Sequence, residues 1–146
     1  MQRIEVERLI PHPIERVFRR YTDHAGWSEW AGLGIVRLVR EGAPDRNGVG
    51  SVRAFALAPG LREEVIVFEP PRRQEYRVTR GAFPLTDHHG EVIFTPEGPG
   101  TLVTWRVTFR SKVPGLGWPV ERGIAALFRW MLRRLARDLD RPSSGS

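Results

Sequence analysis

The sequence contains no cysteine among its 146 residues, and this absence excludes several classes of protein. Without thiols the chain cannot form a disulfide scaffold, a zinc ribbon, an iron–sulfur centre or a thiol nucleophile. No apolar run approaches the roughly 18 residues typical of a membrane-spanning helix, so we expect no stable membrane insertion. The N-terminal residues lack the apolar core of a signal peptide. Together these absences predict a cytoplasmic location.

Sequence motifs for nucleotide and metal chemistry are also missing. The glycines stand singly at expected turns, without a G-x-G-x-x-G or P-loop pattern. Among the four histidines, His12 and His24 lie far from the pair at 88–89, and no spacing resembles a metal-ligand set. We therefore expect no metal and no other cofactor.

Basic residues outnumber acidic ones, 23 to 17, which gives a formal net charge of +6. Lys112 is the one lysine, and such a strong preference for arginine is typical of codon bias rather than of a selected binding surface. The arginines extend from Arg3 to Arg141 with acidic residues between them. A basic module that binds nucleic acid or an anionic membrane is therefore the least favoured of the three possible functions, and we expect no nucleic-acid partner.

Alternation of apolar and polar residues predicts seven strands. One opens the chain at 3–9, and the clearest alternation lies at 101–110, where Trp105 and Phe109 share a face. The others are expected at 35–41, 51–57, 62–68, 74–80 and 88–95. Because tight turns rich in glycine and proline separate the last six strands, we expect an antiparallel meander with one face in solvent.

Helical spacing of apolar residues predicts two short helices and one long one. The first short helix is expected at 13–22, and the second holds Trp27 and Trp30, with Asp23 as its N-cap. Residues 118–140 form an amphipathic helix with Arg122 and other arginines on its polar face, about 33 Å long. We expect one domain over 1–141 and a disordered tail at 142–146.

A sheet of this size needs its apolar face covered, and the long C-terminal helix is the element able to cover it. If the sheet is strongly curved, the helix and the sheet do not meet completely, and the gap between them forms a small-molecule cavity. The alternative is that aromatic side chains fill this space as a solid core.

Several local features occur in a characteristic order along residues 3–140. They are Val6–Phe18, Trp27–Trp30, Gly48–Arg53, Glu69–Arg73 with Tyr76, and Gly100–Trp105. In this order they resemble the START/Bet v 1-like (SRPBCC) superfamily, and within it the polyketide cyclase/dehydrase-like families. The resemblance implies an α+β helix-grip fold, in which a seven-stranded curved antiparallel sheet wraps around a long C-terminal helix.

The superfamily binds hydrophobic ligands such as lipids, sterols and polyketides in a central cavity, and a minority of its members are cyclases or aromatases. The resemblance therefore implies binding, and possible transport, of a small hydrophobic molecule by a monomer or homodimer. The alternative is a polyketide cyclase/aromatase-like enzyme without metal or nucleotide cofactor, with His88 or Tyr76 as the proton-handling group.

The expected ligand-binding residues are mostly aromatic and lie on strand faces that would turn inward. Alternation favours His88 over His89 as the inward histidine, and Phe68 has the most ambiguous orientation. Ten residues make up this set: Trp30, Phe55, Phe68, Tyr76, His88, Phe94, Trp105, Phe109, Phe128 and Met131.

The charged residues of the strands are expected to face solvent. This expectation covers Arg53, Arg77 and Arg106, and strand alternation places no convincing histidine–carboxylate pair inside. Segments 81–85 and 114–117, rich in glycine and proline, are expected to flank the cavity mouth and to gate it.

Overall fold

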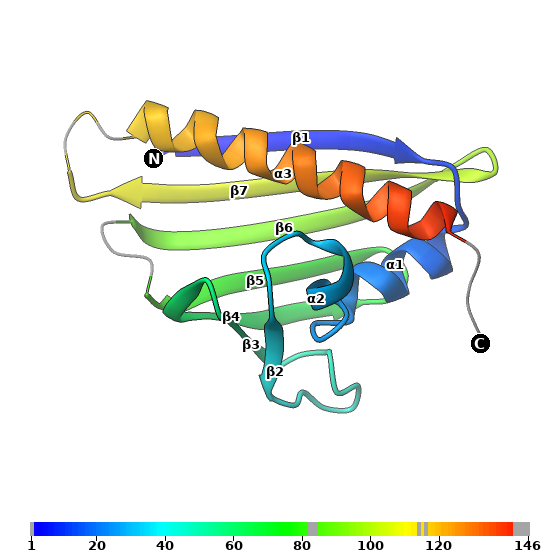
Figure 1. Cartoon of the computed structure of the whole chain (residues 1–146), viewed down its shortest axis with the longest axis horizontal. Helices are drawn as coiled ribbons and strands as arrows, with labels where there is room; N and C mark the ends of the chain where they lie inside the picture. The colour runs from blue at the N-terminus through cyan, green and yellow to red at the C-terminus, as the bar shows by residue number, and fades with distance from the viewer. Residues whose placement is uncertain (1, 82–84, 114, 116, 142–146) are drawn as a thin grey trace.

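A curved antiparallel sheet and one long helix across its concave face make up most of the protein in this computed structural model (Figure 1). The structure describes residues 2–81, 85–113, 115 and 117–141. The sheet has seven strands in the order β1-β7-β6-β5-β4-β3-β2. All neighbouring strands pair antiparallel, which confirms the expected α+β helix-grip architecture.

The elements follow the predicted order along the chain. They are β1 (Gln2–Ile10), α1 (Ile14–Thr22), α2 (Trp27–Trp30), β2 (Val36–Arg40), β3 (Val52–Phe55), β4 (Ala58–Glu69), β5 (Arg73–Arg80), β6 (Leu85–Glu97), β7 (Gly100–Ser111) and α3 (Gly117–Asp140). Because β1 pairs with β7, the first and last strands lie side by side, and the long helix α3 runs along β1 (Figure 1).

Two local predictions differ from the structure. Residues 58–61 separate the strands expected at 51–57 and 62–68, but β4 already begins at Ala58 and includes Pro59 and Gly60, the latter with a positive φ of 90°. A proline is tolerated at such a position near the start of a strand. The N-cap of α2 is Gly26 and not Asp23. The Asp23 carboxylate instead accepts a hydrogen bond from the Gly26 amide at 3.3 Å.

The concave face is apolar because alternate residues of each strand point toward α3. Val6, Trp105 and Val92 are direct neighbours across β1, β7 and β6, and each is at most 3% exposed. Farther along β6, Gly90 lies opposite Tyr76, and a Cβ atom at this glycine would lie 2.2 Å from the tyrosine ring. The missing side chain at position 90 therefore allows the tyrosine ring to lie flat on the sheet.

The apolar stripe of α3 packs onto this face, as helical spacing predicts. Phe128 stacks on Trp105 with ring centroids 3.8 Å apart and an interplanar angle of 8°. Met131, Leu135 and Leu139 continue the stripe, and all three are nearly inaccessible to solvent.

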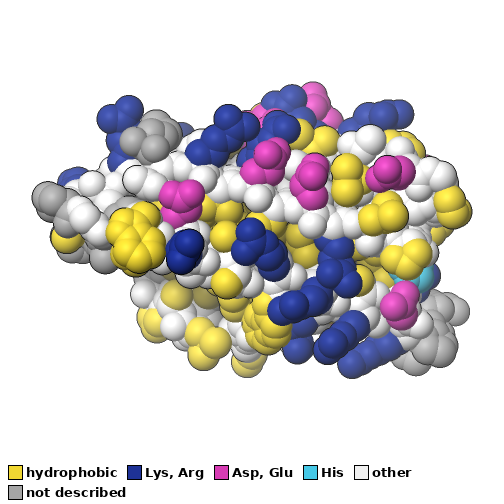
Figure 2. Space-filling model, turned by 90° about the horizontal axis from the view of Figure 1, so that it is seen from above, with side chains coloured by type: hydrophobic (Ala, Val, Ile, Leu, Met, Phe, Trp, Pro, Cys, Tyr) yellow, Lys and Arg dark blue, Asp and Glu magenta, His cyan; other side chains and the backbone are white. Residues whose placement is uncertain are grey.

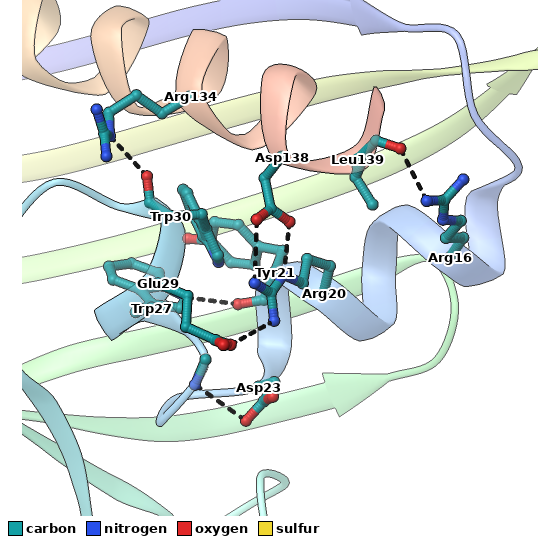
Figure 3. A network of polar contacts seen from close by, with 11 residues as sticks. Arg16, Arg20, Tyr21, Asp23, Trp27, Glu29, Trp30, Arg134, Asp138 and Leu139 are labelled. Atoms are coloured by element: carbon teal, nitrogen blue, oxygen red, sulfur yellow. Dashed lines mark hydrogen bonds and ion pairs between the residues drawn. The ribbon is translucent and has the colours of Figure 1, made fainter. Parts of the chain in front are cut away.

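Polar contacts fasten the C-terminal half of α3 to the two short helices (Figure 3). Arg20 of α1 donates two hydrogen bonds to Asp138, at 2.8 and 3.1 Å, and a third to Glu29 of α2. Arg134 donates from Nε to the backbone oxygen of Trp30 at 2.7 Å. Within the described residues, no side-chain hydrogen bond ties residues 117–133 of α3 to another element, so apolar packing alone positions this part of the helix, which includes its whole N-terminal half.

The outer face of α3 carries arginines, as predicted. Figure 2 shows Lys and Arg side chains on this face of the molecule, interleaved with acidic and hydrophobic ones. Two arginines lie over exposed tryptophans, Arg122 over Trp118 at 5.6 Å and Arg134 over Trp130 at 5.0 Å from the ring centroid. Among the described helices, none is long and apolar enough to cross a membrane.

Candidate ligand cavity

A cavity of about 250 Å³ lies between the N-terminal half of α3 and the concave face of the sheet. Strands β3 to β7, helix α2, the segment after it and helix α3 all contribute to it. Its lining residues are Trp27, Leu33, Phe55, Leu57, Ala58, Leu61, Glu63, Tyr76, His88, Trp105, Ile124, Leu127, Phe128 and Met131. Two of them, Leu57 and Leu127, are also 73% and 37% exposed, so the cavity opens to solvent between the β3–β4 turn and α3.

Six of the ten residues predicted from the sequence line this cavity: Phe55, Tyr76, His88, Trp105, Phe128 and Met131. They come from four different strands and from α3. His88 points inward, as alternation indicates, while His89 lies on the outer face, where its Nε2 is 2.8 Å from Glu75.

The other four predicted residues, Trp30, Phe68, Phe94 and Phe109, are not among the lining residues. Phe94 packs edge-on against Phe18 and Tyr21, and Trp30 packs against the same tyrosine. These rings fill the interior beneath α1 and α2. The interior is therefore solid at that end and hollow beneath the first half of α3.

The remaining two residues lie at the margins of this arrangement. Phe68, at the C-terminal end of β4, contacts Phe18 with ring centroids 5.4 Å apart. Phe109 is fully buried and stacks on His88 with centroids 6.3 Å apart, so it supports a lining residue from the side.

The expected solvent exposure of Arg53 is wrong. Its side chain is 1% exposed on the concave side of β3, and its Nε donates to Oε1 of Glu63 at 2.5 Å. The guanidinium carbon lies 4.0 Å from the Trp27 ring centroid and 4.8 Å from that of Tyr76. A carboxylate partner and two aromatic faces compensate the buried charge in place of water.

The sequence does contain a signal for this ion pair. Arg53 is two residues before Phe55, so a strand face that includes the phenylalanine also includes the arginine. On β4, Glu63 shares its face with Leu61 and Val65, and the two charged residues are direct neighbours across the β3–β4 pair. The prediction that Arg53 faces solvent follows the general preference of arginine for solvent, whereas the strand alternation indicates the concave face.

Glu63 is the one carboxylate among the lining residues of the described cavity. Arg53 donates to its Oε1, and no described group donates to its second oxygen, Oε2. Arg77 and Arg106, by contrast, lie on the outer face, as predicted. They bind Glu64 at 2.9 Å and Glu5 at 2.6 Å.

Tyr76 and His88 supply the other polar atoms of the lining. The Tyr76 oxygen accepts a hydrogen bond from Trp105 Nε1 at 3.0 Å, which leaves the phenol proton free to donate. Burial raises the pKa of this phenol well above its ordinary value, so it stays protonated. Burial also lowers the pKa of His88, which favours a neutral imidazole, and His88 Nδ1 has no partner among the described residues.

A second buried histidine lies behind the ion pair. His24 is inaccessible to solvent, and its Nε2 is 2.9 Å from Ser51 Oγ. Burial, and then the nearby charge of Arg53, lower its pKa from 6.5 to about 3, so His24 is neutral at physiological pH. The described groups in and around the cavity thus carry one positive and one negative charge, which offset each other.

Other parts of the sequence prediction bear on this site. Segments 81–85 and 114–117, expected to flank the mouth, fall largely outside the described residues. In the described part of the chain, no group of three or more His, Cys, Asp or Glu side chains could hold a metal ion. The polar side-chain groups of the lining that could contact a ligand are the Glu63 carboxylate, the Tyr76 hydroxyl and the His88 imidazole.

The sequence matches the family described as "Polyketide cyclase / dehydrase and lipid transport" over residues 1–141. The chain belongs to this family. The match confirms the resemblance inferred from the ordered local features. No curated protein matches the sequence.

Solved structures of low sequence identity share the fold of this polyketide cyclase/dehydrase family member. A Thermobifida fusca protein has a TM-score of 0.79 at 21% identity, covering 94% of this chain and 93% of its own. A Nitrosospira multiformis protein has a TM-score of 0.76 at 19% identity, covering 94% and 95%. A protein of the dynemicin biosynthetic locus has a TM-score of 0.72 at 20% identity, covering 96% of this chain and 48% of its own.

Proposed function

We propose that this protein binds a small hydrophobic molecule in the cavity beneath α3. The observation that carries the proposal is an open, mostly apolar cavity that borders the buried hydrophobic core of the described residues. Side chains normally fill such space, because a void forfeits dispersion contacts and weakens the fold. A cavity with an opening and aromatic walls is the arrangement expected of a ligand site.

The volume limits the size of the ligand. An apolar cavity of about 150 Å³ accommodates benzene, so a cavity of about 250 Å³ has room for a bicyclic aromatic compound or a short alkyl chain. A larger polyketide or a complete lipid would need α3 to move outward. The N-terminal half of α3, held by apolar packing alone, is the part of the lining best able to do so.

Binding is better supported than cyclase-like catalysis. A general acid–base mechanism calls for a proton-handling group oriented by a partner. Within the described residues His88 makes no hydrogen bond to Glu63 or to another carboxylate, and Tyr76 has its pKa raised away from neutrality by burial. The membership of a family named for both cyclases and lipid transport is compatible with either role.

A cavity-filling substitution tests the proposal. We expect Leu61→Trp to place an indole in the cavity and to reduce binding of 2-methylnaphthalene at least about tenfold, because the ligand then competes with a covalently held ring. The matched control is Leu9→Trp, since Leu9 is 53% exposed on β1 and does not line the cavity.

Binding is measured from ¹⁵N–¹H spectra, in which the indole N–H groups of Trp27 and Trp105 report on the cavity directly. The proposal predicts saturable shifts of both signals in the original protein and in the control. Absence of saturable shifts in the original protein, or equal affinity in the original protein and the Leu61→Trp variant, would contradict it.

A further inference from the structure

The polar atoms of the cavity also indicate the chemical class of its ligand. This inference rests on the proposed binding function and extends it. We propose that the cavity selects neutral molecules that carry a hydroxyl group, with Glu63 accepting the hydroxyl proton, over hydrocarbons, carboxylates and amines of the same size.

Glu63 presents to the cavity a carboxylate oxygen that accepts no hydrogen bond from a described group. Arg53 occupies Oε1 from behind, and Oε2 has no donor among the described residues although Glu63 lines an apolar space. The Glu63 side chain is only 13% exposed, so bulk water solvates it poorly. A ligand hydroxyl that donates to Oε2 would form a charge-assisted hydrogen bond in surroundings of low polarity, where such bonds are strongest.

The phenol of Tyr76 also lines the cavity. Its oxygen is already an acceptor for Trp105 Nε1, so the group it offers a ligand is its proton. A hydroxyl can donate to the carboxylate and accept from the phenol at the same time. A hydrocarbon can do neither and leaves both groups unpaired.

The charge balance of the site disfavours charged ligands. Arg53 and Glu63 offset each other, while burial favours the neutral forms of His88 and Tyr76. An ammonium ligand could pair with the free oxygen of Glu63, but Arg53 already offsets that carboxylate, so the site would hold one uncompensated buried positive charge. A carboxylate ligand would bring a negative charge against the free oxygen of Glu63 and would be repelled.

Arg53 does not offer the cavity an anion-binding group. Its two terminal nitrogens have no hydrogen-bond partner among the described residues, which at first indicates a site for an acidic ligand. However, both atoms are fully buried behind the aromatic rings of Trp27 and Tyr76, and Arg53 is not among the lining residues. The charge that meets the cavity is the carboxylate.

The experiment compares four ligands built on one ring system: 2-naphthol, 2-methylnaphthalene, 2-naphthoate and 2-naphthylmethylammonium. Dissociation constants are measured at pH 7 by ¹⁵N–¹H titration. Because a hydrogen bond to a charged group contributes about 1.5–3 kcal/mol, we expect 2-naphthol to bind about 10- to 150-fold more tightly than 2-methylnaphthalene. The two ions should bind more weakly than 2-naphthol by at least about tenfold.

The decisive variant removes both charges together, Arg53→Met with Glu63→Leu, because removing one alone leaves a buried unpaired charge. This double variant should bind 2-methylnaphthalene with little change and should bind 2-naphthol no more tightly than the hydrocarbon. The matched control is Arg77→Met with Glu64→Leu, a pair on the outer face of the same sheet, which should keep the preference for 2-naphthol.

The results separate the two levels of the proposal. Equal binding of naphthol and hydrocarbon, tighter binding of either ion, or a preference that survives in the Arg53/Glu63 double variant would overturn the hydroxyl inference and leave the binding function intact. Failure of all four ligands to bind the unmodified protein would overturn both.

Discussion

The buried ion pair beneath the cavity makes a quantitative prediction about stability. Replacing Glu63 by leucine removes the carboxylate to which Arg53 donates among the described residues. The Arg53 side chain is 1% exposed and cannot turn to solvent without unpacking β3. Breaking a buried pair in this way costs about 3–5 kcal/mol of unfolding free energy. The Trp27 ring, 4.0 Å from the guanidinium carbon, still compensates part of the charge, so we expect a value near the lower end, about 3 kcal/mol.

A matched variant separates this effect from the loss of any glutamate on β4. Glu64, next along the strand, binds Arg77 and Arg40, which are both 59% exposed. Because exposed pairs contribute at most about 1 kcal/mol, Glu64→Leu should reduce the free energy of unfolding by no more than that. The Arg53→Met/Glu63→Leu double variant should recover most of the loss caused by Glu63→Leu, since no unpaired charge remains.

Urea denaturation followed by tryptophan fluorescence measures all four proteins under the same conditions. The reasoning is refuted if Glu63→Leu loses no more stability than Glu64→Leu. It is also refuted if the double variant is less stable than Glu63→Leu, because the partner's charge would then not be the source of the loss.

Three further predictions follow from the packing. Gly90→Ala should lower the free energy of unfolding by about 1–3 kcal/mol, because the added Cβ would overlap the Tyr76 ring on the neighbouring strand. Gly123→Ala in α3, where the space is open, should raise it by about 0.5–1 kcal/mol, and thermal melts compare the two variants. Burial lowers the pKa of His24 to about 3, so its neutral form contributes fully to the free energy of unfolding above pH 6.5. This contribution declines as the pH falls toward 3, by at most about 1.4 kcal/mol per pH unit, and His24→Asn should flatten this slope in denaturant titrations between pH 6.5 and pH 3. Asp138→Asn should weaken the bidentate contact with α1 and increase hydrogen exchange in the last turns of α3 more than in its first turns, and uniform exchange along α3 would contradict this.

The sheet and the long helix could be predicted from the sequence because their residues follow clear periods. Strand alternation determines which side chains face inward, and it identified Tyr76, His88 and Trp105 correctly as residues of the concave face. The spacing of apolar residues in α3 likewise identified Phe128 and Met131.

Alternation predicts which face of the sheet a side chain occupies, but it does not predict where along the curved sheet α3 and the sheet separate. Phe94 and Trp105 both face inward, yet the first contacts Phe18 and Tyr21 in the packed end and the second lines the cavity. The difference depends on where α1 and α2 fold back, which involves contacts distant in sequence. Arg53 was missed for another reason, because its compensation by Glu63 becomes visible only when β3 and β4 are paired.

Intermolecular nuclear Overhauser effects test most directly whether the hollow beneath the first half of α3 is a ligand site. In a saturated complex with 2-naphthol, we predict contacts from the ligand protons to the methyl groups of Leu61, Ile124 and Met131, which line the cavity from both sides. Contacts confined to exposed side chains such as Leu9 and Val39, with none to the cavity residues, would contradict the central claim.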